Sequence, residues 1–334
     1  MIKKIFSGWL IITAFLLVLS PMISSAQSIP TEGVISITMK PENPAPLQTV
    51  TLTLESYTYD LDRSKITWSV DGQNKTTDLG LREFTVQAGK NGHMTTVKAQ
   101  VQTQQDGTVE TEISFIPSAV DLIYESQSYT PPFYKGRSLN PNQGKVLVAA
   151  IPELIKTTGE KISSKSIIYS WKKNGTIDQS ASGMGKDTFT FTGSVPIRDS
   201  VVEVTASSLD GTLTASKEIT ITNVDPKIIF YEDSPVYGIM MNKAIKSTVK
   251  MLTDEFSIFT APYFFSTGYA NTQDLDYTWS MNGKDIDSQD PKNSFTARVD
   301  KAGSGTANIS LKISNNLRIF QIATNSYSIN FEKQ

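Results

Sequence analysis

Hydrophobic and polar residues alternate along most of the chain from about position 34 onward, and this period of two is typical of β-strands. The clearest alternating segments lie at 97–101, 202–206 and 309–313, and turn dipeptides separate such segments about every ten residues. A strand buried on one face gives this alternation, and many short strands with regular turns are typical of a β-sandwich. The pattern therefore predicts an all-β protein.

The alternating pattern occurs three times, each time around a tryptophan. Trp68, Trp171 and Trp279 recur at an interval of about 100 residues, the length of one β-sandwich module. An apolar residue two positions earlier points to the same face of the strand in each repeat. An Asp-Gly or Asn-Gly pair then follows, which suits a two-residue hairpin turn. We expect each tryptophan to lie buried between two sheets.

The remainder of each repeat is also similar. A Phe-Thr pair follows the tryptophan at nearly the same spacing each time, and an alternating strand, a second turn and a closing strand come after it. The phenylalanines of these pairs are Phe84, Phe189 and Phe295.

The second and third repeats share the frame Tyr-x-Trp-x-x-Asn-Gly, at 169–175 and 277–283. This frame resembles the corresponding strand of PKD-type and other bacterial immunoglobulin-like modules. The resemblance implies three tandem immunoglobulin-like β-sandwich domains, which we expect at 27–117, 118–224 and 225–334. The chain has no cysteine pair and lacks the acidic Gly-Asp-Gly turn of PKD modules. The resemblance therefore indicates the fold, and function only by analogy.

The N-terminal segment, positions 1–26, has the three parts of a secretory signal peptide. Lys3 and Lys4 precede an apolar run, and Ser24-Ser25-Ala26 supplies small residues for cleavage after Ala26. The alternative is an uncleaved membrane anchor, but the apolar run from Ile5 to Leu19 is shorter than the ~20 residues that a membrane span needs. We expect an exported protein at the cell surface or outside the cell, or in the periplasm of a cell with an outer membrane. We expect no membrane span in the mature chain.

Composition and charge narrow the partners. The 334 residues include 39% hydrophobic and 19% charged residues and carry a net charge of -2, which is too small to favour nucleic acid. The absence of cysteine excludes disulfides, thiolate metal sites and lipid attachment at the leader, and suits a bacterial envelope. The expected partner is a protein or a glycan of the cell envelope.

Few residues suggest chemistry. The single histidine, His93, lies in a Gly-rich segment between two expected strands, and no nucleophile motif accompanies it, so we expect an exposed loop residue. Pairs of acids at 60/62, 274/276 and 285/287 can be read as calcium ligands or as solvated loop residues. We expect no catalytic residue, no cofactor and no metal ligand.

The aromatic residues of the third repeat are the best candidates for a binding patch. Three rings occur in succession at 263–265, and consecutive strand residues face opposite sides of a sheet. At least one ring must therefore point away from the core of its own module, toward a partner or into the joint between modules. The candidate partner-binding patch consists of Phe256, Phe259, Tyr263, Phe264, Phe265 and Tyr269.

These features lead to two functional hypotheses. The first is a non-enzymatic exported protein, at the surface or secreted, that acts as a spacer, an adhesion module or a partner in envelope assembly. The alternative is a secreted carbohydrate-binding accessory protein or polysaccharide-active enzyme whose site lies at a joint between modules. An enzyme would normally have one module that differs from the others and contains a convergent polar pocket. The second and third repeats are similar to each other, which favours the first hypothesis.

Overall fold

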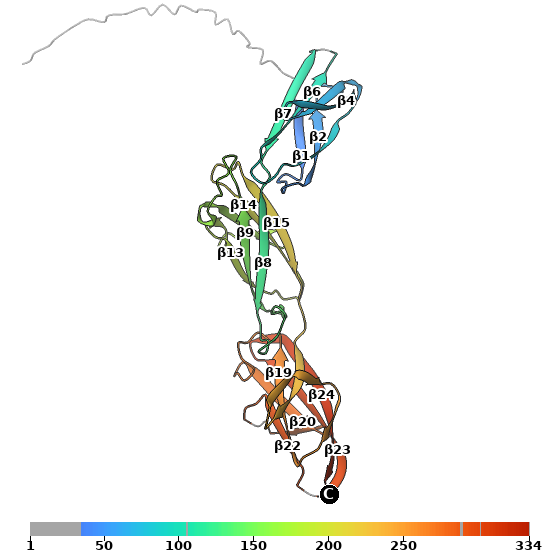
Figure 1. Ribbon diagram of the computed structural model, residues 1–334, viewed down its shortest axis with the longest axis vertical. Coiled ribbons are helices and arrows are strands. Elements are labelled where there is room, and N and C mark those ends of the chain that lie inside the picture. Colours follow the sequence, from blue (N-terminus) through green and yellow to red (C-terminus); the bar gives the residue numbers. More distant parts are fainter. Residues whose placement is uncertain (1–34, 105, 288–289, 301, 334) are drawn as a thin grey trace, which may run out of the picture.

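The computed structural model describes residues 35–104, 106–287, 290–300 and 302–333. The expected signal peptide and its cleavage site lie outside these residues. The described chain is all-β, and it forms three immunoglobulin-like β-sandwiches that follow one another in an elongated row (Figure 1). The expected fold is thereby confirmed.

The first sandwich packs a three-stranded sheet against a four-stranded sheet. The first sheet has the order β1-β2-β5 and the second β4-β3-β6-β7, and all of their pairings are antiparallel. A 3-10 turn, η1, lies at Leu61–Arg63. The strands are β1 Ile35–Lys40, β2 Thr49–Ser56, β3 Lys65–Val70, β4 Gln73–Leu79, β5 Glu83–Gln87, β6 Thr95–Gln102 and β7 Thr108–Phe115.

The second sandwich repeats this arrangement. The sheet β13-β9-β8 packs against β11-β10-β14-β15, and β12 also pairs with β10. A 3-10 turn, η2, lies at Ser164–Ser166. The strands are β8 Ala119–Gln127, β9 Lys145–Glu153, β10 Ile168–Lys173, β11 Thr176–Ile177, β12 Gly183–Met184, β13 Thr188–Thr192, β14 Ser200–Ser207 and β15 Thr214–Ile221.

The third sandwich packs the sheet β17-β16-β19-β22 against β18-β24-β23-β20-β21. Its edge strand β18 runs parallel to β24, whereas the other pairings are antiparallel. The strands are β16 Lys227–Ser234, β17 Gly238–Ile245, β18 Thr248–Met251, β19 Glu255–Tyr263, β20 Leu275–Met281, β21 Lys284–Ile286, β22 Ser294–Arg298, β23 Gly303–Asn315 and β24 Arg318–Lys333.

A buried tryptophan is the centre of each core, as the sequence predicts. Each indole packs against the phenylalanine of the Phe-Thr pair, and its Nε1 donates a hydrogen bond to a backbone carbonyl at 2.9 to 3.0 Å. Burying the ring while satisfying its one polar atom makes it a favourable core residue. The ring pairs are Trp68–Phe84 at 5.4 Å, Trp171–Phe189 at 5.6 Å and Trp279–Phe295 at 5.2 Å.

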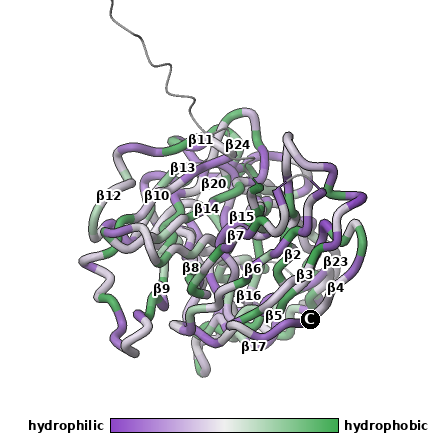
Figure 2. Tube along the Cα trace, turned by 90° about the horizontal axis from the view of Figure 1, so that it is seen from above, coloured by the Kyte–Doolittle hydropathy of each residue, from purple (hydrophilic) through white to green (hydrophobic). Residues whose placement is uncertain are grey.

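Seen from above, the strands carry both hydrophobic and hydrophilic positions (Figure 2). Burial alternates along strands such as β6 and β14. Each sandwich has its own apolar cluster that draws on both of its sheets. A fourth, smaller apolar cluster lies on the outer face of a sheet of the third module and includes a residue from the second. This fourth cluster marks the joint between these two modules.

Candidate binding site at the joint of the second and third modules

The segment that follows β8, residues 128–144, leaves the second sandwich and reaches the third. The Tyr129 N–H donates a hydrogen bond to the Phe265 carbonyl at 2.8 Å, and the Phe264 N–H donates one to the Tyr129 carbonyl at 2.9 Å. These two main-chain hydrogen bonds link the segment across the joint to the residues that follow β19. The 128–144 segment thus fixes the two modules together.

The outer face of β19 provides the surface on which this segment packs. Tyr129, only 9% exposed, lies in an apolar cluster with Tyr231 and Ala261, and Phe259 and Tyr263 are packed against the cluster. The inner face of β19 meanwhile contributes Ile258 to the main core. This strand is therefore apolar on both faces because both faces are covered.

The structure separates the six residues of the candidate patch. Phe265 is fully buried in the main core, and Phe256 packs against the same core. Phe264, at a positive φ of 61°, is also buried, whereas Phe259 and Tyr263 are half-buried at the joint. Tyr269 is 77% exposed. Partner binding by this patch stays a prediction, with Tyr269 as the most accessible ring.

Tyrosine rings at the joint meet edge to face and share a hydrogen bond. Tyr134 of the second module lies 5.8 Å from Tyr263 and 6.0 Å from Phe264, between ring centroids. The Tyr231 and Tyr263 hydroxyls lie 2.8 Å apart. Burial, and the hydrogen bond shared with Tyr231, raise the pKa of Tyr263 far above its usual value. The phenol of Tyr263 is therefore neutral near pH 7 and serves the joint as a packing and hydrogen-bonding group.

A buried glutamine on the last strand completes the joint. Gln321, 0% exposed, donates from Nε2 to the Asn142 carbonyl at 2.6 Å and to the Ser266 hydroxyl at 2.8 Å. Its Oε1 accepts from the Ser266 N–H at 2.8 Å and from Asn315 Nδ2 at 3.0 Å. Nothing in the sequence pattern singled out Gln321, because a lone glutamine in a strand reads as a solvent-facing residue.

Beside this joint lies a hollow of about 630 Å³ between the two modules. Two charged residues of the second module, Glu125 and Lys145, and two of the third, Asp274 and Arg318, line it. Side-chain hydroxyl groups contribute much of the remaining lining, and they belong to Ser126, Ser128, Thr130, Ser138, Ser266 and Thr267. The hollow is polar and open to solvent, as a site for a hydrophilic ligand needs to be.

The four charged groups of the hollow have few partners. Within the described residues, the side chains of Glu125, Lys145 and Asp274 form no hydrogen bond or ion pair, and the one hydrogen bond that Arg318 donates goes to the Leu317 carbonyl at 3.4 Å. Ser128 and Ser138, in contrast, bond to each other at 2.6 Å. The charged groups are thus the part of the lining that is available to a ligand.

The other candidate residues lie apart from this joint or in solvent. His93 is an exposed turn residue whose N–H donates to the Lys90 carbonyl at 3.0 Å. Asp60 and Asp62 form exposed ion pairs with Arg63 and Arg82, each at 3.6 Å. In the part of the chain that the structure describes, no three His, Cys, Asp or Glu residues come close enough to hold a metal ion.

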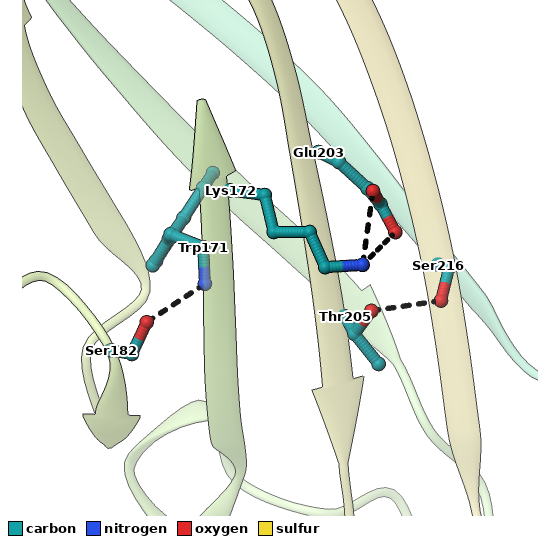
Figure 3. A network of polar contacts seen from close by, with 6 residues as sticks. All are labelled: Trp171, Lys172, Ser182, Glu203, Thr205 and Ser216. Atoms are coloured by element: carbon teal, nitrogen blue, oxygen red, sulfur yellow. Dashed lines mark hydrogen bonds and ion pairs between the residues drawn. The ribbon is translucent and has the colours of Figure 1, made fainter. Parts of the chain in front are cut away.

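A polar network on the second module is complete in itself (Figure 3). Lys172 on β10 pairs with Glu203 on β14 at 3.2 Å, and the hydroxyls of Thr205 and Ser216 lie 3.1 Å apart. These side chains satisfy one another across neighbouring strands, as cross-strand pairs do. These pairs stabilise the sheet.

No protein-family model and no curated protein matches the chain. Solved structures with a likeness to it include three domains of the bacteriophage RB49 outer capsid protein Hoc, at 15% identity and a TM-score of 0.25, covering 90% of this chain and 99% of that one. The central fibronectin-III array of RIM-binding protein has 12% identity and a TM-score of 0.28, with coverage of 90% and 96%.

A third likeness is to the Bacteroides ovatus protein SGBP-B of a mixed-linkage glucan utilization locus, solved with a mixed-linkage heptasaccharide. It has 12% identity and a TM-score of 0.21, with 87% of this chain and 65% of that chain covered. Because these TM-scores are low, the class of the protein follows from its own strand order and cores: three tandem immunoglobulin-like modules. Among the described residues, no helix is long and apolar enough to cross a membrane.

Proposed function

We propose that this chain is an exported, non-enzymatic protein, at the cell surface or secreted, which uses its modules as a spacer that presents a binding site. The observation that carries the proposal is the interlocked joint between the second and third modules. Tyr129 closes that joint by apolar packing. Gln321 is held by three hydrogen bonds within the third module and donates a fourth across the joint to the Asn142 carbonyl. A fixed joint holds residues from two modules in one geometry, which favours binding because less ordering is needed when the ligand arrives.

The charges around the joint support binding more than catalysis. A general acid or base needs a pKa near the working pH and a partner that orients it. The acids of the hollow, Glu125 and Asp274, are not held by a neighbouring side chain among the described residues. A spacer or adhesion module does not need an acid or base that is oriented by a partner side chain.

Capture experiments test this proposal. Residues 27–334, immobilised, are to be incubated separately with solubilised envelope proteins and with purified envelope polysaccharides of the source cell. We expect saturable capture of one of these, with the polysaccharide chains unchanged in length by size-exclusion chromatography. Shortened chains would instead identify a polysaccharide-active enzyme and overturn the non-enzymatic proposal.

Export is tested by the mature N-terminus. Lys3, Lys4 and the apolar run that follows support a cleaved leader. N-terminal sequencing of the protein recovered from the medium or envelope should begin at Gln27. Recovery from the membrane with Met1 retained would establish an anchor instead.

A further inference from the structure

The hollow at the joint combines features of a site for a polyhydroxylated ligand. Glu125 and Lys145 approach it from one module and Asp274 and Arg318 from the other, two charges of each sign. Because these charges balance, the hollow has no net charge to attract a strongly ionic ligand such as a phosphate or a polycation. Charged donors and acceptors form the strongest hydrogen bonds to neutral hydroxyl groups. The lining is thus suited to a ligand that offers many hydroxyls.

An exposed aromatic residue directly follows two lining residues of the hollow in the sequence. Tyr269, 77% exposed, follows the lining residues Thr267 and Gly268. The Thr267 hydroxyl donates to the Tyr269 carbonyl at 3.1 Å and accepts from the Tyr269 N–H at 3.4 Å, so it fixes the backbone that carries the ring. A tyrosine offers an apolar face with a polar tip, and the apolar C–H face of a sugar ring can pack on it.

The volume agrees with a short segment of a glycan. Pockets for small ligands measure about 300 to 1,000 Å³, and the hollow, at about 630 Å³, falls in the middle of this range. Its open side allows a longer chain to continue into solvent.

We propose that the hollow between the second and third modules binds a saccharide, with the sugar hydroxyls bonded to Glu125, Asp274, Lys145 and Arg318 and one sugar ring packed on Tyr269. This inference rests on the proposed function and specifies its ligand class. It also explains why two modules are held in a fixed geometry, since each contributes half of the charged groups.

The test uses residues 27–334 on an array of defined neutral and acidic oligosaccharides, followed by titration calorimetry with the best-bound oligosaccharide. Tyr269→Ala should weaken binding about tenfold, because the packing surface for the sugar ring is lost. Asp274→Asn should weaken binding to a similar extent, because a charged acceptor becomes a neutral one. Both variants should keep the wild-type unfolding temperature.

A matched control is available in the same module. Tyr237 is 79% exposed, close to the value for Tyr269, but it lies in the turn between β16 and β17, and no lining residue of the hollow is next to it in the chain. Tyr237→Ala should leave the affinity unchanged. If it weakens binding as much as Tyr269→Ala, or if neither Tyr269→Ala nor Asp274→Asn has an effect, the hollow is not the saccharide site.

The inference and the proposed function can fail separately. An array without a bound oligosaccharide overturns the saccharide inference, whereas saturable capture of an envelope protein in the same preparation would leave the spacer and adhesion proposal standing. Array binding together with shortening of the bound oligosaccharide would overturn the proposed function and keep the site.

Discussion

In all three modules, the first residue of the hairpin turn that follows the tryptophan strand both adopts a positive φ and accepts a hydrogen bond with its side chain. Asp71, Asn174 and Asn282 have φ near 50°, and each is followed by a glycine with φ near 78°. The side-chain Oδ1 of each also accepts a hydrogen bond of 2.9 Å from a backbone N–H at the start of, or within, the next core strand. The dipeptide pattern predicted the turn. The hydrogen bond to the side-chain Oδ1 could not be predicted in the same way, because it depends on which strand lies beside the turn.

Replacing Asn174 tests this role. Asn174→Ala removes the bond to the Val201 N–H and places a Cβ-bearing residue without a compensating side chain at positive φ. We expect the second module to lose about 2 kcal/mol of unfolding free energy. Asn174→Asp is the matched control, because the first module already uses aspartate here, and it should cost much less. Urea denaturation of the three proteins measures the difference, and equal losses would contradict the role of Oδ1.

Asp210 gives a prediction in pH. The Ser208 hydroxyl at 2.6 Å, the Thr212 N–H at 3.1 Å and the Thr212 hydroxyl at 2.8 Å lower the pKa of this carboxyl to about 2. A folded-state pKa below the unfolded value, about 4, stabilises the fold above pH 4, and the stabilisation is lost as the pH falls toward 2. Because an amide cannot ionise, the Asp210→Asn variant should lack this pH-dependent contribution to the free energy of unfolding.

The measurement is denaturation of wild type and Asp210→Asn at pH 5, 3 and 2. The difference in stability between the two proteins should shrink as the pH falls. A difference that is constant across this range would show that the carboxylate charge contributes nothing.

At the scale of elements, the aromatic residues at the end of β19 show which features of the joint could be predicted from the sequence and which could not. Three aromatic residues in succession required at least one ring to leave the main core, and Tyr263 does so. The sequence offered no means to predict what covers that ring, because Tyr129 belongs to the preceding module and its position depends on the angle between modules. The periodic pattern thus predicted the sandwiches, whereas the joint depends on contacts between distant segments.

Tyr129 should therefore stabilise the module to which it does not belong. Tyr129→Ala removes a large side chain from the apolar cluster on β16 and β19, and such truncations cost about 3 kcal/mol. Hydrogen exchange should increase in β16 and β19 more than in β8. Phe133, 93% exposed in the same segment, is the control, and Phe133→Ala should change nothing. Faster exchange confined to the second module would contradict this account.

At the scale of the whole molecule, the two joints differ in construction. Within the described residues, hydrogen bonds such as Asn91 Nδ2 to the Glu153 carbonyl at 2.9 Å connect the first and second modules, and the partly buried Ile116 packs against the core of the second. No separate apolar cluster forms between these two modules in the described residues. The second joint has both an apolar cluster and the Gln321 network. We expect bending of the row to occur mainly at the first joint.

Spin-label distances test this difference, and the absence of native cysteine makes labelling specific. Pairs at Thr77 and Thr190, and at Thr190 and Lys312, span the first and the second joint. The first distance distribution should be broad and the second narrow. Gln321→Ala should broaden only the second, because it leaves the Asn142 carbonyl without its donor. Equal widths in the unaltered chain would refute the prediction.

The reach of the 128–144 segment across the joint also has a consequence for the order in which the protein is made. Tyr129 leaves the ribosome more than a full module before Phe264 and Phe265, to which it bonds. A module is about 100 residues, and synthesis at about 5 to 20 residues per second takes on the order of ten seconds to cover it. During that time the second sandwich can complete its own sheets while Tyr129 remains uncovered. The contacts of Tyr129 can therefore form only after Phe264 and Phe265 have been made, and they are the last contacts of the second module to be completed.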